Sequence, residues 1–177
     1  MLEWKKSLDG YEVPIIQGQS LGSLRAHRAE AEKWVERVSE LCSQSDLIVV
    51  LGLGSGTHIQ TLKEKFASEK IIVFDFFPEV LGPIRAKNQY PIGTSIFFLN
   101  EVEDVFETSV ISEIFAQRPP VLLFGPVRLV ANRLYEDLQM TLTARNPAGR
   151  ARFSDWLAKN SHAEKESVWE TLGELLK

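Results

Sequence analysis

Four short runs of apolar residues recur along the middle of the chain, and helical patterns separate them. The runs cover residues 46–52, 71–75, 95–99 and 120–124. The first two are rich in β-branched residues, as in parallel strands that are covered on both faces. Between the runs, apolar residues return at spacings of three and four, which indicates helices with one buried face. The alternation predicts an α/β fold with a Rossmann-like, open, mostly parallel sheet and helices on both faces.

The pattern also divides the chain into three parts. Residues 1–23 mix glycines with short apolar pairs, and we expect an N-terminal arm that is extended or forms a small hairpin. A helix is predicted over 24–42, with Ser23 as its N-cap, and it opens a Rossmann-like domain over 24–145. Its apolar stripe consists of Ala31, Trp34, Val35, Val38, Leu41 and Cys42.

After Asn146-Pro147 the chain becomes polar, and residues 146–177 are predicted to be a helical tail or a linker towards a further domain. Apolar patches around Trp156 and Trp169 are too narrow for a core. They are therefore expected to pack on the sheet domain or on another protein.

Composition narrows the class of protein. A chain of 177 residues, 44% hydrophobic and 25% charged, has the length and balance of one globular domain. A net charge of −4 argues against a general nucleic-acid partner. The longest apolar stretch, 47–53, is too short to span a membrane, and no signal peptide opens the chain. The single cysteine, Cys42, cannot form an internal disulfide. We therefore expect a cytoplasmic protein without membrane or nucleic-acid partners.

The most informative segment is the glycine turn Gly52-Leu-Gly-Ser-Gly-Thr-His58, between the first buried strand and the next helix. Glycines at such a turn let a ligand approach the backbone, where free N–H groups at the helix start can meet its anionic or hydroxyl groups. Asp75 ends the next strand, at the offset where a carboxylate accepts hydrogen bonds from a ribose. Both strand ends meet at the carboxyl edge of the sheet, where such folds bind ligands.

The spacing of the glycines separates two kinds of nucleotide site. The dinucleotide fingerprint G-x-G-x-x-G has Thr57 in its third glycine position, which weakens a nicotinamide or flavin interpretation. The spacing G-x-G-x-G is closer to methyltransferase-like Rossmann folds, with Gly52 in place of their leading Asp and His58 in place of their last Gly. Glu101, just after the third strand, stands where those enzymes often have an acid near the adenine.

The candidate binding residues are therefore Gly52, Gly54, Ser55, Gly56, His58, Asp75 and Glu101. The ligand stays open between a nucleotide, a nucleotide sugar and S-adenosylmethionine. The alternative is that the glycines only permit tight packing of the strand against the helix.

The other polar residues do not predict a metal site or a catalytic site. The three histidines are far apart and lack partners at metal-ligand spacing, so no metal site is predicted. No catalytic Ser-His-Asp or Cys-His set is apparent. Two basic clusters are interpreted as solvated faces, with contact to an anion as the alternative. They are Arg25, His27 and Arg28, and Arg145, Arg150 and Arg152.

Four segments, in order, resemble the N-terminal region of the motility accessory factor family. These are bacterial glycosyltransferases that are thought to attach nonulosonic sugars to flagellin. The segments are 21–33, which resembles the family's early helix; 47–58, with the sequence LIVVLGLGSGTH; 71–79, with IIVFDFFPE; and 143–146 with 152–160, which includes a Trp and spaced Asn residues.

The resemblance implies a Rossmann-like domain without chemistry of its own, because the family's transferase activity is assigned to a central domain downstream. No catalytic residue is carried over. Flagellin or that transferase domain would be the partner, and the role would be scaffolding, acceptor recognition or nucleotide binding. Two alternatives stay open: a small S-adenosylmethionine-dependent methyltransferase, and an interaction module that docks through its C-terminal Trp and Leu residues on a partner or a second copy.

Overall fold

The computed structural model describes residues 1–86, 89–143, 151 and 154–155. Its centre is a four-stranded parallel sheet with the order β6-β5-β4-β7. The strands are β4 (Leu47–Leu51), β5 (Lys70–Asp75), β6 (Thr94–Phe98) and β7 (Val121–Leu123). Each of their ends lies within one residue of the predicted apolar run. The predicted Rossmann-like α/β fold is confirmed, with the first strand, β4, in the interior of the sheet.

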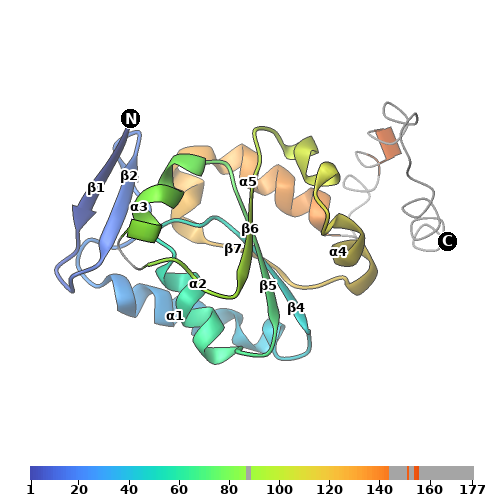
Figure 1. Ribbon diagram of the computed structural model, residues 1–177, viewed down its shortest axis with the longest axis horizontal. Coiled ribbons are helices and arrows are strands. Elements are labelled where there is room, and N and C mark those ends of the chain that lie inside the picture. The colour runs from blue at the N-terminus through green and yellow to red at the C-terminus, as the bar shows by residue number, and fades with distance from the viewer. Residues whose placement is uncertain (87–88, 144–150, 152–153, 156–177) are drawn as a thin grey trace.

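Helices cover both faces of this sheet (Figure 1). The helices α1 (His27–Cys42) and α2 (Thr57–Lys65) lie on one side, and α5 (Arg128–Leu142) lies on the other. Shorter helices complete the connections: α3 (Leu81–Ala86), α4 (Ile111–Gln117) and the 3₁₀ turns η1 (Pro78–Val80), η2 (Val102–Glu107) and η3 (Gly125–Val127). None of the helices in the described part of the chain is long and apolar enough to cross a membrane.

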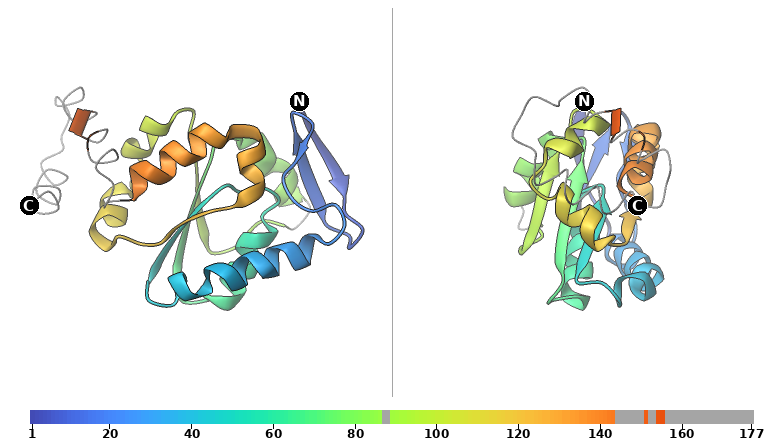
Figure 2. Two further views of the ribbon diagram at one scale, coloured as in Figure 1. Left: turned by 180° about the vertical axis from the view of Figure 1, so that it is seen from behind. Right: turned by 90° about the vertical axis from the view of Figure 1, so that its right-hand side faces the viewer.

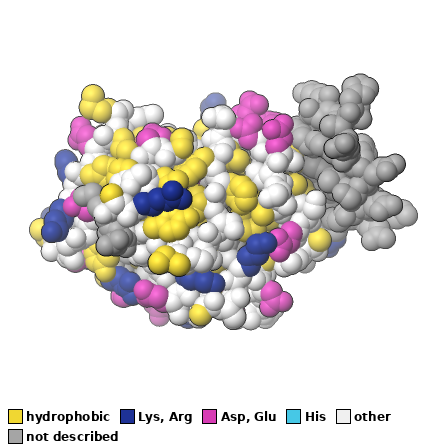
Figure 3. Space-filling model, in the orientation of Figure 1, with side chains coloured by type: hydrophobic (Ala, Val, Ile, Leu, Met, Phe, Trp, Pro, Cys, Tyr) yellow, Lys and Arg dark blue, Asp and Glu magenta, His cyan; other side chains and the backbone are white. Residues whose placement is uncertain are grey.

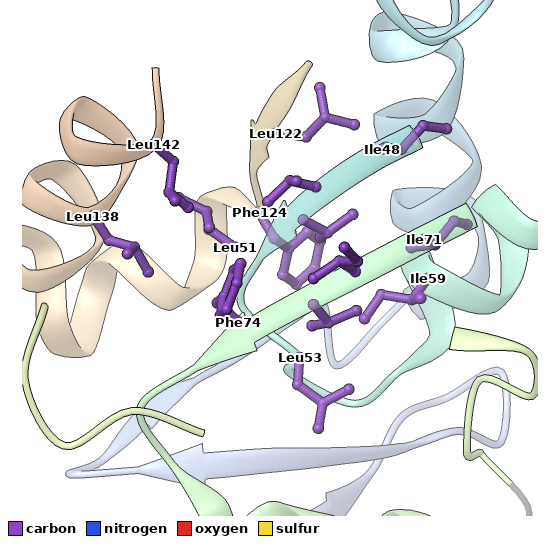
Figure 4. Packing of buried hydrophobic residues seen from close by; sticks show 14 of the residues in the cluster. Ile48, Leu51, Leu53, Ile59, Ile71, Phe74, Leu122, Phe124, Leu138 and Leu142 are labelled. Atoms are coloured by element: carbon purple, nitrogen blue, oxygen red, sulfur yellow. The ribbon is translucent and has the colours of Figure 1, made fainter. Parts of the chain in front are cut away.

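The core follows from the composition of the strands. Every residue of β4 is buried, as are all residues of β5 after Lys70. In Figure 4, Leu138 and Leu142 of α5 lie on the same side of the sheet as Leu51 and Phe74. Apolar side chains project from both faces of β4 and β5. The sheet is therefore stable only when helices cover both of its faces.

The N-terminal arm is a separate three-stranded antiparallel sheet. It consists of β1 (Leu2–Lys6), β2 (Glu12–Ile16) and β3 (Gln19–Ser20), and β2 pairs with both neighbours. Figure 2 shows this small sheet at the end of the molecule that lies opposite α4. Ile16 and Leu21 reach from it into the main core. The arm is therefore packed on the domain.

Several local predictions are corrected. The helix predicted from residue 24 begins at His27, and Ala26 is its N-cap, because the Ser23 hydroxyl accepts the N–H groups of Arg25 and Ala26 in the preceding turn. Leu41, predicted to face the core, is 64% exposed. The short α3 was not predicted. The apolar patches expected around Trp156 and Trp169 lie outside the described residues.

Candidate functional site

The glycine turn connects β4 to α2, as the sequence predicts, and three of its residues have positive φ angles. A methyl group on Gly52 would lie 2.6 Å from a side-chain carbon of Val127, and one on Gly56 would lie 2.5 Å from the backbone oxygen of Gln89. At Gly54 the nearest atom would be a ring carbon of Phe124, at 3.2 Å. The space beside these glycines is thus occupied by the protein's own groups.

Burial of the turn is complete along its length. Every residue from Gly52 to His58 is buried, and Leu53, Ser55 and Thr57 have no exposed surface. Gly52 donates its N–H to the carbonyl of Phe74, at 2.8 Å, which continues the β4–β5 ladder into the turn. Of the N–H groups that the sequence suggested for a ligand, those of Gly52 and Leu53 are therefore bonded to the end of β5, and that of Gly56 is bonded to the carbonyl of Leu53 within the turn.

Asp75 is fully buried at the end of β5, and its carboxylate points into the turn. One oxygen accepts the N–H of Leu53 at 2.5 Å, and the other accepts the N–H of Phe77 at 2.7 Å. Burial raises the pKa of Asp75 to about 6, although these N–H groups and the nearby hydroxyl of Tyr135 act to lower it. Both carboxylate oxygens thus hold backbone in place.

His27 contacts the glycine turn, which the sequence did not predict. Its Nε2 lies 2.5 Å from the Ser55 hydroxyl oxygen, and the Ser55 hydroxyl donates to the hydroxyl of Thr57 at 3.1 Å. Burial lowers the pKa of His27. The available signal was its position four residues before Ala31, which extends the apolar stripe of α1 by one turn.

The basic cluster that included His27 is a solvated face only in part, because Arg25 is exposed and Arg28 is half-buried, whereas His27 is buried. Arg28 donates to Glu32 within α1 and to Glu64 of α2, both at 2.8 Å, and so links the two helices. The other basic cluster, Arg145, Arg150 and Arg152, lies outside the described residues.

His58 lies in an aromatic environment under the turn. Its ring stacks on Phe124 with centroids 3.6 Å apart and meets the edge of Trp34 at 5.2 Å. Nε2 lies 3.0 Å from the carbonyl of Gly52, so this nitrogen carries the proton. Burial lowers the pKa of His58 to about 3. His58 is thus a neutral histidine that closes the turn internally.

Gln89 and the N-terminal arm cover the turn from outside. The Gln89 amide donates to the carbonyls of Ser55 and Glu12, and its oxygen accepts the N–H of Glu12. The side chain therefore joins the turn to β2. The backbone oxygen of Leu21 lies 3.4 Å from where a methyl group on Gly54 would be.

Glu101 is exposed and follows β6. Its side chain caps the first turn of η2, while the Asp104 carboxylate accepts the backbone N–H of Glu101 in return. Its carboxylate therefore stabilises the start of η2. The residues brought together around the turn are Gly52, Gly54, Ser55, Gly56, His58 and Asp75.

Shallow grooves lie elsewhere on the surface. One of 590 Å³ runs between α1 and α2 and is bordered by Glu32, Lys33, Thr61 and Glu64, and none of its lining residues belongs to the turn. Among the described residues, no group of three or more His, Cys, Asp or Glu side chains could hold a metal ion. Cys42 is buried, and burial raises the pKa of its thiol to about 11. The thiol is accordingly unreactive at neutral pH.

Comparison with known proteins adds no family: no family model matches this chain, and no curated protein matches it.

Proposed function

We propose that this chain is a non-catalytic Rossmann-like domain of a flagellin-modifying glycosyltransferase of the motility accessory factor type, with a role in scaffolding or acceptor recognition. The four ordered segments support the family, and the closed glycine turn supports the role. One observation carries the choice of role: the Asp75 carboxylate accepts the N–H groups of Leu53 and Phe77 with its two oxygens. The cytoplasm stays the proposed location.

The geometry of Asp75 disfavours nucleotide binding for a simple reason. In nucleotide-binding Rossmann folds, a carboxylate at the end of this strand accepts hydrogen bonds from the ribose hydroxyl groups. Here the carboxylate is fully buried and supports the turn that a ligand would have to approach. Binding would require the turn to give up these hydrogen bonds and the cover made by His27 and Gln89, and each buried group left unpaired costs roughly 1–3 kcal/mol. The domain therefore acts through its surface.

Binding of flagellin tests this proposal. Purified flagellin of the source organism, titrated into the full chain in a calorimeter, should bind saturably, and an unrelated protein of similar charge should not. A second measurement sizes the natural polypeptide by immunoblotting of source cells. The proposal expects a longer polypeptide with a transferase domain, or a complex with one. A polypeptide of this length that binds neither flagellin nor a transferase would contradict it.

A methyltransferase is the second candidate, because one observation favours it. In the order β6-β5-β4-β7, the glycine turn follows the interior strand β4, and Asp75 is the last residue of the neighbouring strand β5, which is the arrangement of nucleotide-binding Rossmann halves. Calorimetry with S-adenosylhomocysteine distinguishes the two. Heat of binding that Asp75→Asn abolishes would favour the methyltransferase, whereas no heat at millimolar ligand would remove it.

A further inference from the structure

The two margins of the parallel sheet are its edge strands, β7 and β6. They differ in whether their outward backbone groups have hydrogen-bond partners. At the β7 margin, the carbonyl of Val121 accepts the side-chain amide of Gln139 at 3.1 Å, and the carbonyl of Leu123 accepts the Trp34 indole at 3.3 Å. The Phe124 N–H donates to Leu51 of β4, so Val121 and Leu123 are the residues that face outward. Side chains of α5 and α1 therefore satisfy the outer carbonyls of β7.

The β6 margin has no such caps among the described residues. The N–H of Leu99 donates to the carbonyl of Asp75 at 2.9 Å, which fixes the alternation along β6. Ser95, Phe97 and Leu99 consequently face β5, while the N–H and C=O groups of Thr94, Ile96 and Phe98 point outward. Within the described part of the chain, β5 is the only strand beside β6, and no hydrogen bond reaches the outward groups of Ile96 and Phe98.

The chemistry of this margin favours pairing with another strand. The sequence Thr-Ser-Ile-Phe-Phe has no charge and no proline, the devices by which edge strands usually avoid other chains, and all five residues are half-buried. Figure 1 views the sheet from this margin, with β6 in front, and Figure 3 shows hydrophobic side chains on this face of the molecule. Ile92, just before β6, is 83% exposed.

A second copy of the chain fits this margin better than another extended segment does, because the outward groups are symmetric about Ile96. If two β6 strands run antiparallel with Ile96 opposite Ile96, Thr94 lies opposite Phe98 of the second copy. Every outward N–H and C=O of the three residues then has a partner. A two-fold axis is also the commonest symmetry of protein oligomers.

Charge at the two ends of β6 supports the same arrangement. Near the start, the Lys63 ammonium donates to the carbonyls of Ala67 and Glu69, and its Cε lies 3.4 Å from where a methyl group on Gly93 would be. After the end come three acids, Glu101, Glu103 and Asp104. Antiparallel pairing places the positive charge of Lys63 in one copy near these acids of the other. A parallel pairing would place like charges together.

We propose that this chain forms a two-fold symmetric dimer in which the β6 strands pair antiparallel about Ile96, so that the sheet continues from one copy into the other. This interface is independent of the function proposed above, because it uses no residue of the glycine turn.

Substitutions that introduce a positive or a negative charge at position 96 test the dimer. The full chain should be dimeric by light scattering after size-exclusion chromatography. Ile96→Lys and Ile96→Glu each place like charges on the two-fold axis and should each raise the dissociation constant of the dimer at least about tenfold. An equimolar mixture of the two variants should dimerise again. Leu41→Lys, which replaces an exposed leucine of α1, should leave the dimer unchanged.

Hydrogen exchange of the unsubstituted protein gives a second test that does not depend on the folding of a variant. The amides of Ile96 and Phe98 should become protected as protein concentration rises, while the inward amide of Phe97 should be protected at every concentration. A monomer throughout the micromolar range would overturn the proposal. Exchange at Ile96 that does not depend on concentration would also overturn it, as would variants that dimerise like the unsubstituted chain.

Discussion

Gly56 shows at the residue scale why the turn is closed. Its φ angle is +83°, and a methyl group there would lie 2.5 Å from the backbone oxygen of Gln89, whereas Gly10 has a similar φ of +94° and open space beside it. Both Gly→Ala variants should lose about 1–2 kcal/mol through backbone strain. Gly56→Ala should lose about a further 1–3 kcal/mol through overpacking, as measured by denaturant unfolding. Equal losses would mean that the groups around the turn move aside easily.

His58 makes a distinct prediction about pH. Its pKa is lowered to about 3 in the folded state from 6.5, so the unfolded chain binds more protons between these values, and stability falls as pH falls through this window. Asp75 acts in the opposite direction, because its pKa is raised to about 6 from 3.8 and its contribution is lost as pH rises through that window.

Replacing His58 with Phe should isolate the histidine's contribution. The stability difference between the natural chain and His58→Phe should grow with pH between about 4 and 6, by at most about 1.4 kcal/mol per pH unit. Phe124→Leu disturbs the same ring stack without removing a titrating group, so its destabilisation should not depend on pH over this range. Parallel stability curves for the natural chain and His58→Phe would show that the histidine is not buried in its neutral form.

At the scale of elements, the small N-terminal sheet is attached to the turn through one side chain. Gln89 makes two hydrogen bonds to the backbone of Glu12 and one to the carbonyl of Ser55. Gln89→Ala should lower stability by about 1–3 kcal/mol, since the variant loses the buried hydrogen bond to the carbonyl of Ser55 and the two half-buried ones to Glu12. The exposed Gln117→Ala is the matched control and should change stability by less than about 0.5 kcal/mol. If Gln89 attaches the small sheet to the turn, the amides of β2 should exchange faster in Gln89→Ala than in the natural chain, and no faster in Gln117→Ala. Equal exchange rates in the two variants would contradict this attachment.

The parallel strands were predictable because each one is buried on both faces and so appears as an unbroken apolar run. The arm was harder to predict, since both strands are short, β1 has no buried residue, and β2 contains Pro14, which is unusual inside a strand. The short α3 contains Gly82 and Pro83, which usually mark a turn. Local pattern alone therefore located the main sheet and left its surroundings undetermined.

The site was predictable only in part, for a similar reason. The position of the glycine turn and its proximity to Asp75 follow from strand order. What covers the turn comes from distant parts of the chain: Gln89 lies 34 residues after Ser55, and His27 lies 28 before it. The stripe of α1 indicates that His27 is buried, but no local pattern shows that it lies against Ser55 or that Gln89 covers the turn, so the sequence could not distinguish an open nucleotide site from a closed turn.

At the scale of the whole molecule, the carboxyl edge of the sheet is closed by the protein itself. The turn is buried, the Asp75 carboxylate is bonded to it, and Ile16 and Leu21 of the covering arm are part of the hydrophobic core. A domain of this kind interacts with partners through its outer surfaces, and the uncapped margin of β6 is one such surface.

The amide of Leu53 reports this closure most directly, because its N–H is donated to the Asp75 carboxylate. Hydrogen exchange by NMR should show this amide opening only with global unfolding, at the same slow rate as the amides of β4, and adding S-adenosylhomocysteine or a nucleotide sugar should not change that rate. Fast exchange at Leu53 that either ligand slows would contradict the account and would identify the turn as a binding site.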